Sequence, residues 1–134
     1  MASDISKYLG NKICRWLAGN AMPTAPTTLY LALFDGDPKS TGTEVTEDVN
    51  SAGRVAIDLD AIADDGTDVL LTSDADADFG ASEADVSISH LAVFDASSAG
   101  NMLFSKAATG GPFAVTTGSN VKAPSGDLTF TVGS

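Results

Sequence analysis

A five-residue string, LALFD at positions 31–35, returns almost unchanged as LAVFD at positions 91–95. Each copy runs directly into a polar turn that contains glycine, at positions 36–38 after the first copy and 97–101 after the second. The aspartate that closes each copy can accept hydrogen bonds from the backbone of the turn that follows it. Two copies of one strand-and-turn unit predict a protein built from β-sheet, and no catalytic constellation accompanies either copy.

Strand periodicity continues through the rest of the chain from Thr27 onward. Segment 28–34 is almost continuously apolar, which predicts a central strand buried on both faces, and segment 36–52 is rich in turn residues. Short strands at close spacing, separated by Gly, Asp, Ser and Pro, predict an all-β fold, an antiparallel β-sandwich of Greek-key-like or jelly-roll-like form. The other predicted strands are 54–59, 69–72, 76–81, 86–95, 102–106, 113–117, 121–123 and 128–132.

One N-terminal amphipathic α-helix precedes the predicted strands. Ser3 is the expected N-cap, and the helix should end near Ala18, because Gly19 and Asn20 tolerate the left-handed conformation that ends many helices. Prolines at positions 23 and 26 then stiffen an extended connector. We therefore expect a helical arm, residues 1–22, and a β-sandwich domain, residues 23–134. The apolar residues at helical spacing are Ile5, Tyr8, Leu9, Ile13, Trp16 and Leu17.

The formal net charge of −11 is distributed unevenly. Residues 1–22 carry three cations and one acid, whereas residues 23–134 carry four cations and seventeen acids. A body this acidic lacks the clustered Lys and Arg that phosphate binding requires, so nucleic acid is not an expected partner. Neither a secretory signal nor an apolar stretch of membrane-spanning length is recognisable, so synthesis in a cytoplasm is expected and a membrane partner is not.

The chain offers little to an enzyme or a metal centre. Cys14 is the only cysteine and His90 the only histidine, so an intrachain disulfide and a Cys/His zinc cluster are excluded. His90 falls in a predicted strand without a serine–acid pattern, and a packed or edge histidine is the expected role. Cys14 lies beside the apolar helix face, where a small buried hydrophobic residue is expected. We therefore expect no enzymatic activity and no cofactor.

The acidic cluster Asp74, Asp76 and Asp78 is the most site-like feature of the chain. Carboxylates at alternate positions project from one face of an extended segment and could share a hard cation such as calcium. The helix–loop–helix calcium pattern needs glycine at its sixth position and glutamate at its twelfth, where this chain has Phe79 and Asp85. These three aspartates are therefore weak metal candidates, and a solvated acidic edge that discourages strand aggregation is the favoured interpretation.

The N-terminal helix is the main candidate for a binding surface. It either packs on its own body or contacts another chain. The charge distribution favours a partner, because a cationic helix on a stiff connector is attracted to an acidic neighbour, including a second copy of this body. The residues predicted to bind the partner are Lys7, Tyr8, Lys12, Arg15 and Trp16.

Two stretches of the chain resemble a family of small virion structural proteins of tailed phages. The first comprises residues 16–19, 22–23, 26, 29–34 and 37–38, and the second His90, residues 93–96, 100–101 and 103–104. Together they cover residues 16–38 and 90–104. Such proteins are commonly labelled tail-fibre, minor tail or head-associated proteins. The resemblance implies a virion component with a β-sandwich body, made in the host cytoplasm, and it provides no catalytic residues to transfer. Segment 74–85 is not part of the pattern.

These observations predict a non-enzymatic structural protein, and three readings of its role remain open. The leading hypothesis is a capsid decoration or turret protein outside the head, attached by its helix to the major capsid protein or to sister subunits. The alternative is a minor tail or tail-fibre-associated protein that contacts tail proteins. A hypothesis of another class is a calcium- or carbohydrate-binding β-sandwich module. A homo-oligomer is expected under both virion readings.

Overall fold

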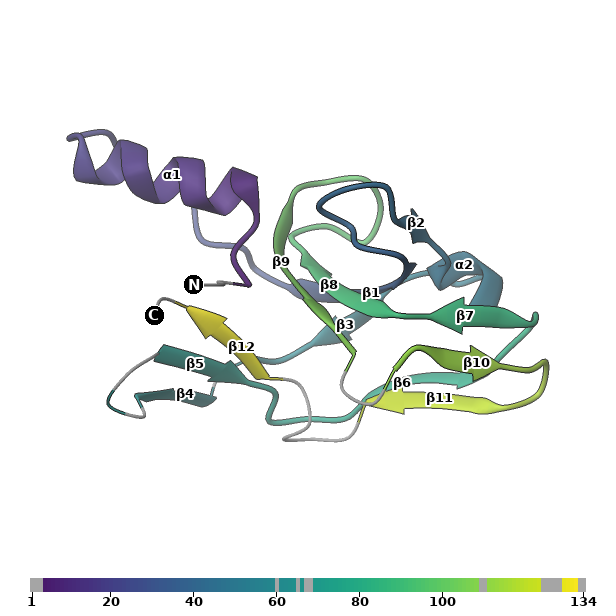
Figure 1. The fold of residues 1–134 in the computed structure, drawn as a ribbon. Helices are drawn as coiled ribbons and strands as arrows, with labels where there is room; N and C mark the ends of the chain where they lie inside the picture. The colour runs from purple at the N-terminus through teal and green to yellow at the C-terminus, as the bar shows by residue number, and fades with distance from the viewer. Residues whose placement is uncertain are drawn as a thin grey trace.

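The computed structural model of the chain describes residues 4–59, 61–64, 66, 69–108, 111–123 and 129–132. Figure 1 shows an antiparallel β-sandwich preceded by one amphipathic helix, which confirms the predicted fold class. In chain order, the elements are α1 (Lys7–Leu17), β1 (Leu29–Asp35), β2 (Thr43–Glu44), α2 (Thr46–Val49), β3 (Val55–Ile57), β4 (Ala61–Asp64), β5 (Val69–Thr72), β6 (Ala77–Ala81), β7 (Val86–Ile88), β8 (His90–Phe94), β9 (Met102–Ala107), β10 (Phe113–Val115), β11 (Asn120–Ala123) and β12 (Thr129–Val132).

The two copies of the repeated string are neighbouring strands at the centre of the largest sheet. β1 and β8 pair antiparallel, with Ala32 opposite Ala92 in the middle of the ladder. β9 pairs with β8, while β2 and β3 both pair with β1, which makes a sheet of five strands. Leu31 and Leu33 belong to the main core, whereas Ala32 and Phe34 pack with Ala92 on the opposite face. The predicted burial of the first copy on both faces is therefore confirmed.

Three small sheets cover one face of the five-stranded sheet. They pair β10 with β7, β11 with β6, and β12 with β5 and β4. In Figure 1 they lie below β1, β8 and β9. Phe79, Ile88 and Phe130 from the small sheets belong to the same hydrophobic cluster as Leu31 and Val93 from the large one. The main core therefore lies between the two layers, as in a β-sandwich.

Segment 86–95, which was predicted as one strand, forms two strands in different sheets. β7 ends at Ile88, β8 begins at His90, and Ser89 lies between them. The Ser89 hydroxyl accepts a hydrogen bond from the N–H of Gly36 at 2.6 Å, and its own N–H donates to the carbonyl of Phe34 at 2.9 Å. The chain changes sheet at Ser89 because these bonds fix this residue against the end of β1 and the turn that follows.

Three elements were not predicted: β2 and α2, inside the turn-rich segment 36–52, and β4, which pairs with β5. Thr46, at the start of α2, is completely buried, and its hydroxyl accepts from the N–H of Leu33 at 2.9 Å and donates to Glu44 at 2.8 Å. Such short elements form because neighbouring strands provide their partners, which the composition of each segment alone does not reveal. Leu128, the predicted start of the last strand, lies outside the described residues.

The turn after each repeat is stabilised by an aspartate, although only one is the predicted residue. The carboxylate of Asp95 accepts from the backbone N–H of Asn101 at 2.8 Å and from its side-chain amide at 3.1 Å, as expected. In the first turn, the bond described is made by Asp37, which accepts from the N–H of Lys39 at 2.9 Å. Asp37 therefore has the role that we predicted for Asp35.

Arg54 connects the second of these turns to β2. Its guanidinium donates two hydrogen bonds to the carboxylate of Glu44, both 2.9 Å long. It also donates to the carbonyls of Ala96 and Ala99, at 3.0 and 2.8 Å. The same group lies 3.8 Å from the centroid of the Phe94 ring. With only 7% of its side chain exposed, Arg54 fixes the end of the five-stranded sheet that lies beside α2.

Candidate interaction surface

Helix α1 is fixed to the edge of the five-stranded sheet at its N-terminal end. The N–H of Ser6 donates to the carbonyl of Leu103 at 2.8 Å, and the N–H of Ser105 donates to the carbonyl of Asp4 at 2.8 Å. Residues 4–6 thus add a short extended segment beside β9. The base of α1 is therefore attached to the sheet by backbone hydrogen bonds. A helix on a freely moving arm would lack these bonds.

The helix begins at Lys7, later than predicted. Ser6 is the N-cap, and its hydroxyl accepts a hydrogen bond from the N–H of Leu9 at 3.1 Å. Residues 4–6 are extended because β9 satisfies their backbone groups, so the helix cannot start at Asp4 as expected. Ser3, the predicted N-cap, lies outside the described residues.

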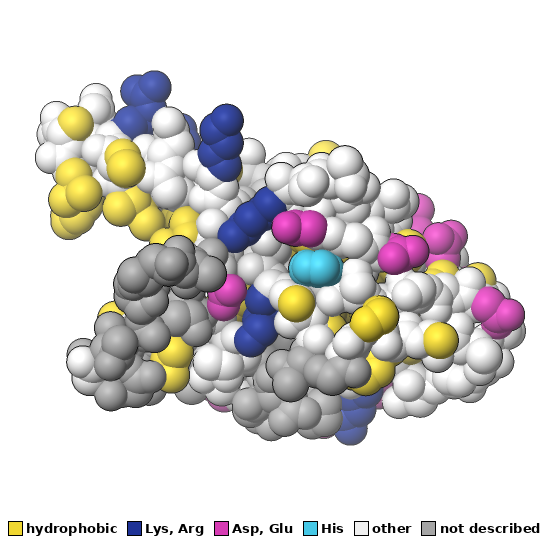
Figure 2. Space-filling model, in the orientation of Figure 1, with side chains coloured by type: hydrophobic (Ala, Val, Ile, Leu, Met, Phe, Trp, Pro, Cys, Tyr) yellow, Lys and Arg dark blue, Asp and Glu magenta, His cyan; other side chains and the backbone are white. Residues whose placement is uncertain are grey.

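The apolar stripe of α1 is covered over only half of its length. Tyr8 and Leu9 pack together with Ile5 against the main core. At the other end, Trp16 is 57% exposed and Leu17 is 72% exposed. Figure 2 shows hydrophobic side chains gathered on the underside of the projecting helix. The sequence left two alternatives for the helix, packing on its own body or contact with a partner. The covered base packs on the body, and the uncovered end is free to contact a partner.

The cationic side chains lie on the upper side of α1 in Figure 2. The ammonium of Lys12 is 5.4 Å from the centroid of the Tyr8 ring, and the Nε of Arg15 donates to the side chain of Asn11 at 3.1 Å. Lys7 and Arg15 are exposed. The five residues predicted to bind a partner are therefore on one helix but do not share one face, since Tyr8 packs inward while Lys7 and Arg15 face solvent.

The end of α1 and the connector after it are exposed together. Ala18 is the C-cap and Gly19 has a φ of 99°, so the helix ends where the sequence predicted. Residues 18–28 are all exposed, including Met22 at 43%. We call these exposed apolar residues, Trp16, Leu17 and Met22, the helix tip.

The structure contradicts the prediction for Cys14 and agrees with the prediction for His90. The prediction that Cys14 is buried is wrong, because this thiol is free and exposed on the part of α1 that extends beyond the sheet. His90 is half-buried in β8, with its Nδ1 2.9 Å from the hydroxyl of Ser89. This matches the expected packed or edge histidine.

The three candidate metal ligands are exposed and in part paired with protein groups. Asp76 forms an ion pair with Lys122 at 3.2 Å, and the carboxylate of Asp78 accepts from the N–H of Gly80 at 2.8 Å. Asp74 and Asp76 precede β6, so only Asp78 is on the strand. Among the residues that the structure describes, no three His, Cys, Asp or Glu side chains are gathered closely enough to hold a metal ion.

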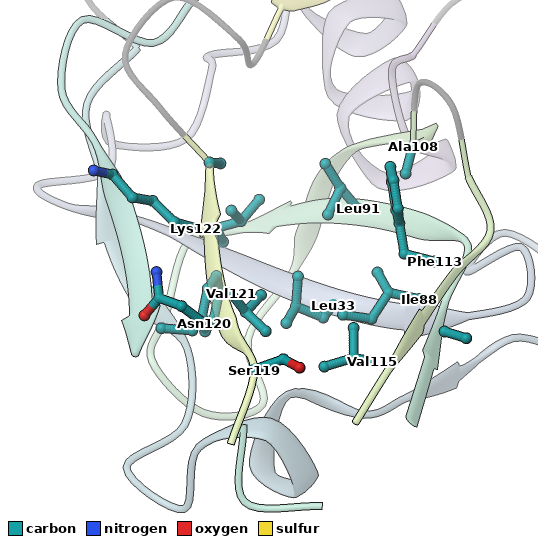
Figure 3. Close-up of a pocket in the computed structure, with 14 residues that line it drawn as sticks. Leu33, Ile88, Leu91, Ala108, Phe113, Val115, Ser119, Asn120, Val121 and Lys122 are labelled. Carbon is teal, nitrogen blue, oxygen red and sulfur yellow. The ribbon is translucent and has the colours of Figure 1, made fainter. Parts of the chain in front are cut away.

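The sequence did not predict an apolar pocket of about 330 Å³ that lies between β10 and β11. Figure 3 shows Val115 on β10 and Val121 on β11 facing each other across Leu33 and Ile88. Phe113, at the side of the pocket, is 46% exposed. The residues come from β1, β6, β7, β8, β10 and β11 and from the neighbouring loops. The only local signals were the apolar run 113–115 and the alternation of polar and apolar residues in 120–123.

A comparison with protein families gives a match over nearly the whole chain. The model described as Podophage GP4 fiber I protein gp80 matches residues 4–131. The chain belongs to this family. The comparison with curated proteins gives no match.

Membership of the Podophage GP4 fiber I protein gp80 family confirms the resemblance to tailed-phage virion proteins. The chain is therefore a structural component of a phage virion, related to fibres. The match includes all of α1, so the helix is part of the family pattern together with the sandwich. Within the described residues, no helix has the length and hydropathy of a membrane-spanning segment.

Proposed function

We propose that this chain is a globular, non-enzymatic subunit of a fibre on a tailed-phage particle, and that the helix tip attaches it there. The observation that carries this proposal is the uncovered half of the apolar stripe on α1, where Trp16 is 57% and Leu17 72% exposed. Near the base of the helix, the residues of the same stripe pack against the main core. A large aromatic side chain beside Arg is typical of the residues that dominate the energy of protein interfaces.

The family description supports a fibre over the head decoration that we first expected from sequence. The match to a fibre protein covers residues 4–131, whereas the resemblance noted from the sequence included both head-associated and tail proteins. The chain has no repetitive shaft sequence. We therefore assign it to a globular part of the fibre, and the decoration role becomes an outcome of the test.

Charge supports the orientation of the subunit. The helical segment carries Lys7, Lys12 and Arg15, whereas the sandwich is strongly acidic. A cationic helix approaches an acidic neighbour faster and in a preferred orientation, and the acidic sandwich repels such contacts elsewhere. The partner is another virion protein or a sister subunit in a homo-oligomer, and the sandwich is the part displayed to solvent.

The location is tested by labelling intact particles of the phage that encodes this chain. Gold-conjugated antibodies against the sandwich should bind along or at the ends of fibres in electron micrographs. Labelling spread over the head shell would replace the fibre role with capsid decoration. Particles without label, but with the protein present in the infected cell, would show that it is not a virion subunit.

A further inference from the structure

Two apolar features without a partner among the described residues lie at opposite ends of the structure. The helix tip projects at one end, and the pocket between β10 and β11 lies towards the other (Figures 1 and 3). Because hydrogen bonds fix the base of α1 to β9, the tip cannot reach the pocket of its own chain without breaking them. Any contact between these two surfaces must join different copies.

The chemistry of the pocket suits an apolar side chain better than a sugar or an ion. Its volume of about 330 Å³ is at the lower end of the range for ligand pockets, roughly 300–1,000 Å³. Of its fourteen lining residues, only Ser119, Asn120 and Lys122 have polar side chains. Lys122 is already paired with Asp76. A sugar would need several convergent polar groups, whereas an indole or a leucyl side chain needs only apolar walls.

The strands beside the pocket belong to an acidic part of the chain, although the charged residue that lines the pocket is Lys122. Residues 73–88, which contain β6 and β7, carry five acids and no Lys or Arg, and residues 111–123 carry one lysine. The acids are Asp74, Asp76, Asp78, Glu83 and Asp85. The helix brings Lys7, Lys12 and Arg15, and Lys12 lies one turn from Trp16 and beside the Tyr8 ring. Opposite charges around an apolar contact steer the encounter and disfavour incorrect orientations.

We propose that the pocket between β10 and β11 receives the helix tip of a second copy of this chain, with Trp16 and Leu17 as the anchors. Copies then join head to tail. Such a contact uses two different surfaces of one subunit, so it builds a ring or an open row instead of a closed twofold dimer. This inference rests on the proposed function, because it names a partner for the same helix tip that the proposed function uses for attachment.

The chain contains a built-in probe for this contact, because Trp16 is its only tryptophan. Transfer of an indole from water into an apolar pocket shifts its fluorescence emission to shorter wavelength. We expect this shift as the concentration of the purified protein is raised, together with growth of the molar mass measured by sedimentation. A reducing agent is required throughout, because exposed Cys14 would otherwise link copies covalently.

Two pairs of variants separate the two surfaces. Ser119 is exposed, and in Figure 3 its side chain points towards Val115, so Ser119→Arg obstructs the pocket and adds a charge that repels α1. Its matched control is Ser40→Arg, at an exposed turn residue that is not among those that line the pocket. Leu17→Gln should weaken association about tenfold, whereas Ile62→Gln, at a side chain that is similarly exposed (69%), should not.

Mixing two defective variants tests the head-to-tail arrangement directly. Ser119→Arg retains Trp16 but has an obstructed pocket, and Trp16→Ala retains the pocket but lacks both the anchor and the fluorophore. Neither should associate alone at concentrations where the wild type does. Together they should restore the blue shift, because the intact tip of the first enters the intact pocket of the second. Equal melting temperatures of variants and wild type show that folding is retained.

Two results would overturn this inference. A blue shift that persists in Ser119→Arg alone would show that helix tips contact each other. An emission maximum that stays constant to millimolar concentration would show that the second copy is not the occupant. In that case the proposed attachment of α1 to a different virion protein would remain, because particle labelling and incorporation test it separately.

Discussion

Arg54 makes four hydrogen bonds and one aromatic contact at one end of the five-stranded sheet. Its guanidinium binds both oxygens of Glu44 and the carbonyls of Ala96 and Ala99. Ala99 has a φ of 52°, a conformation that non-glycine residues seldom adopt. The guanidinium thus stabilises an unfavourable turn and positions the end of the five-stranded sheet.

Replacement of Arg54 by lysine should destabilise the fold although the charge is kept. Lysine cannot provide the planar fork that binds a carboxylate and two carbonyls together, so we expect a loss of about 2 kcal/mol in the free energy of unfolding. Urea denaturation measures it, with Lys39→Arg as an exposed control for the exchange of cations. Unchanged stability would mean that the turn holds its conformation without these bonds.

The ion pair between Glu44 and Arg54 also predicts how stability depends on pH. Burial raises the pKa of Glu44, but hydrogen bonds from Arg54 and Thr46 and the charge of Arg54 outweigh it, so the pKa lies below the usual 4.5. A lowered folded-state pKa adds stability that is present above pH 4.5 and is lost as the pH falls through the folded value. The wild type should therefore melt higher than Glu44→Gln at neutral pH, and the difference should shrink in acid. A difference that stays constant down to about pH 3 would contradict this assignment.

Calcium should leave the melting temperature unchanged at millimolar concentration. Asp76 is paired with Lys122, and Asp78 is engaged with the N–H of Gly80, so binding a cation would require both contacts to rearrange. A ligand that binds only the folded state raises its stability in proportion to RT ln(1 + [L]/Kd). A rise in melting temperature that Asp76→Asn abolishes would establish the calcium-binding module that we set aside.

Helix α1 shows how far local sequence determines an element. Its periodicity, its cations and its end at Ala18 were predicted correctly, since these depend on neighbouring residues. Its start was not, because pairing of residues 4–6 with β9 is a long-range contact. Segment 86–95 was divided between two sheets for the same reason, through the bonds of Ser89 to β1.

Ser6→Ala should loosen the start of α1. The hydroxyl of Ser6 satisfies the N–H of Leu9, and loss of such an N-cap costs about 1 kcal/mol. Hydrogen exchange should speed up at the first amides of α1, whereas amides of β1 should exchange unchanged. The exposed substitution Ser97→Ala is the control. Equal exchange rates in α1 would show that its start does not depend on this cap.

The arrangement of the subunit was predicted only in outline. The fold class followed from strand spacing and turn residues, whereas the choice of the helix as the main candidate surface stays a prediction. Sequence could not show which half of the apolar stripe is covered, because that depends on where the edge of β9 ends relative to α1. The pocket was missed because six strands build it, and each contributes only one to four residues.

Incorporation of a helix-tip variant into phage particles is the most direct test. Trp16→Ala combined with Leu17→Ala removes two exposed side chains and should leave the melting temperature unchanged. Quantitative mass spectrometry of purified particles should find this variant reduced at least about tenfold relative to the wild type, and Ile62→Ala at the wild-type level. Wild-type incorporation of the double variant would contradict the assignment of the helix tip as the attachment surface.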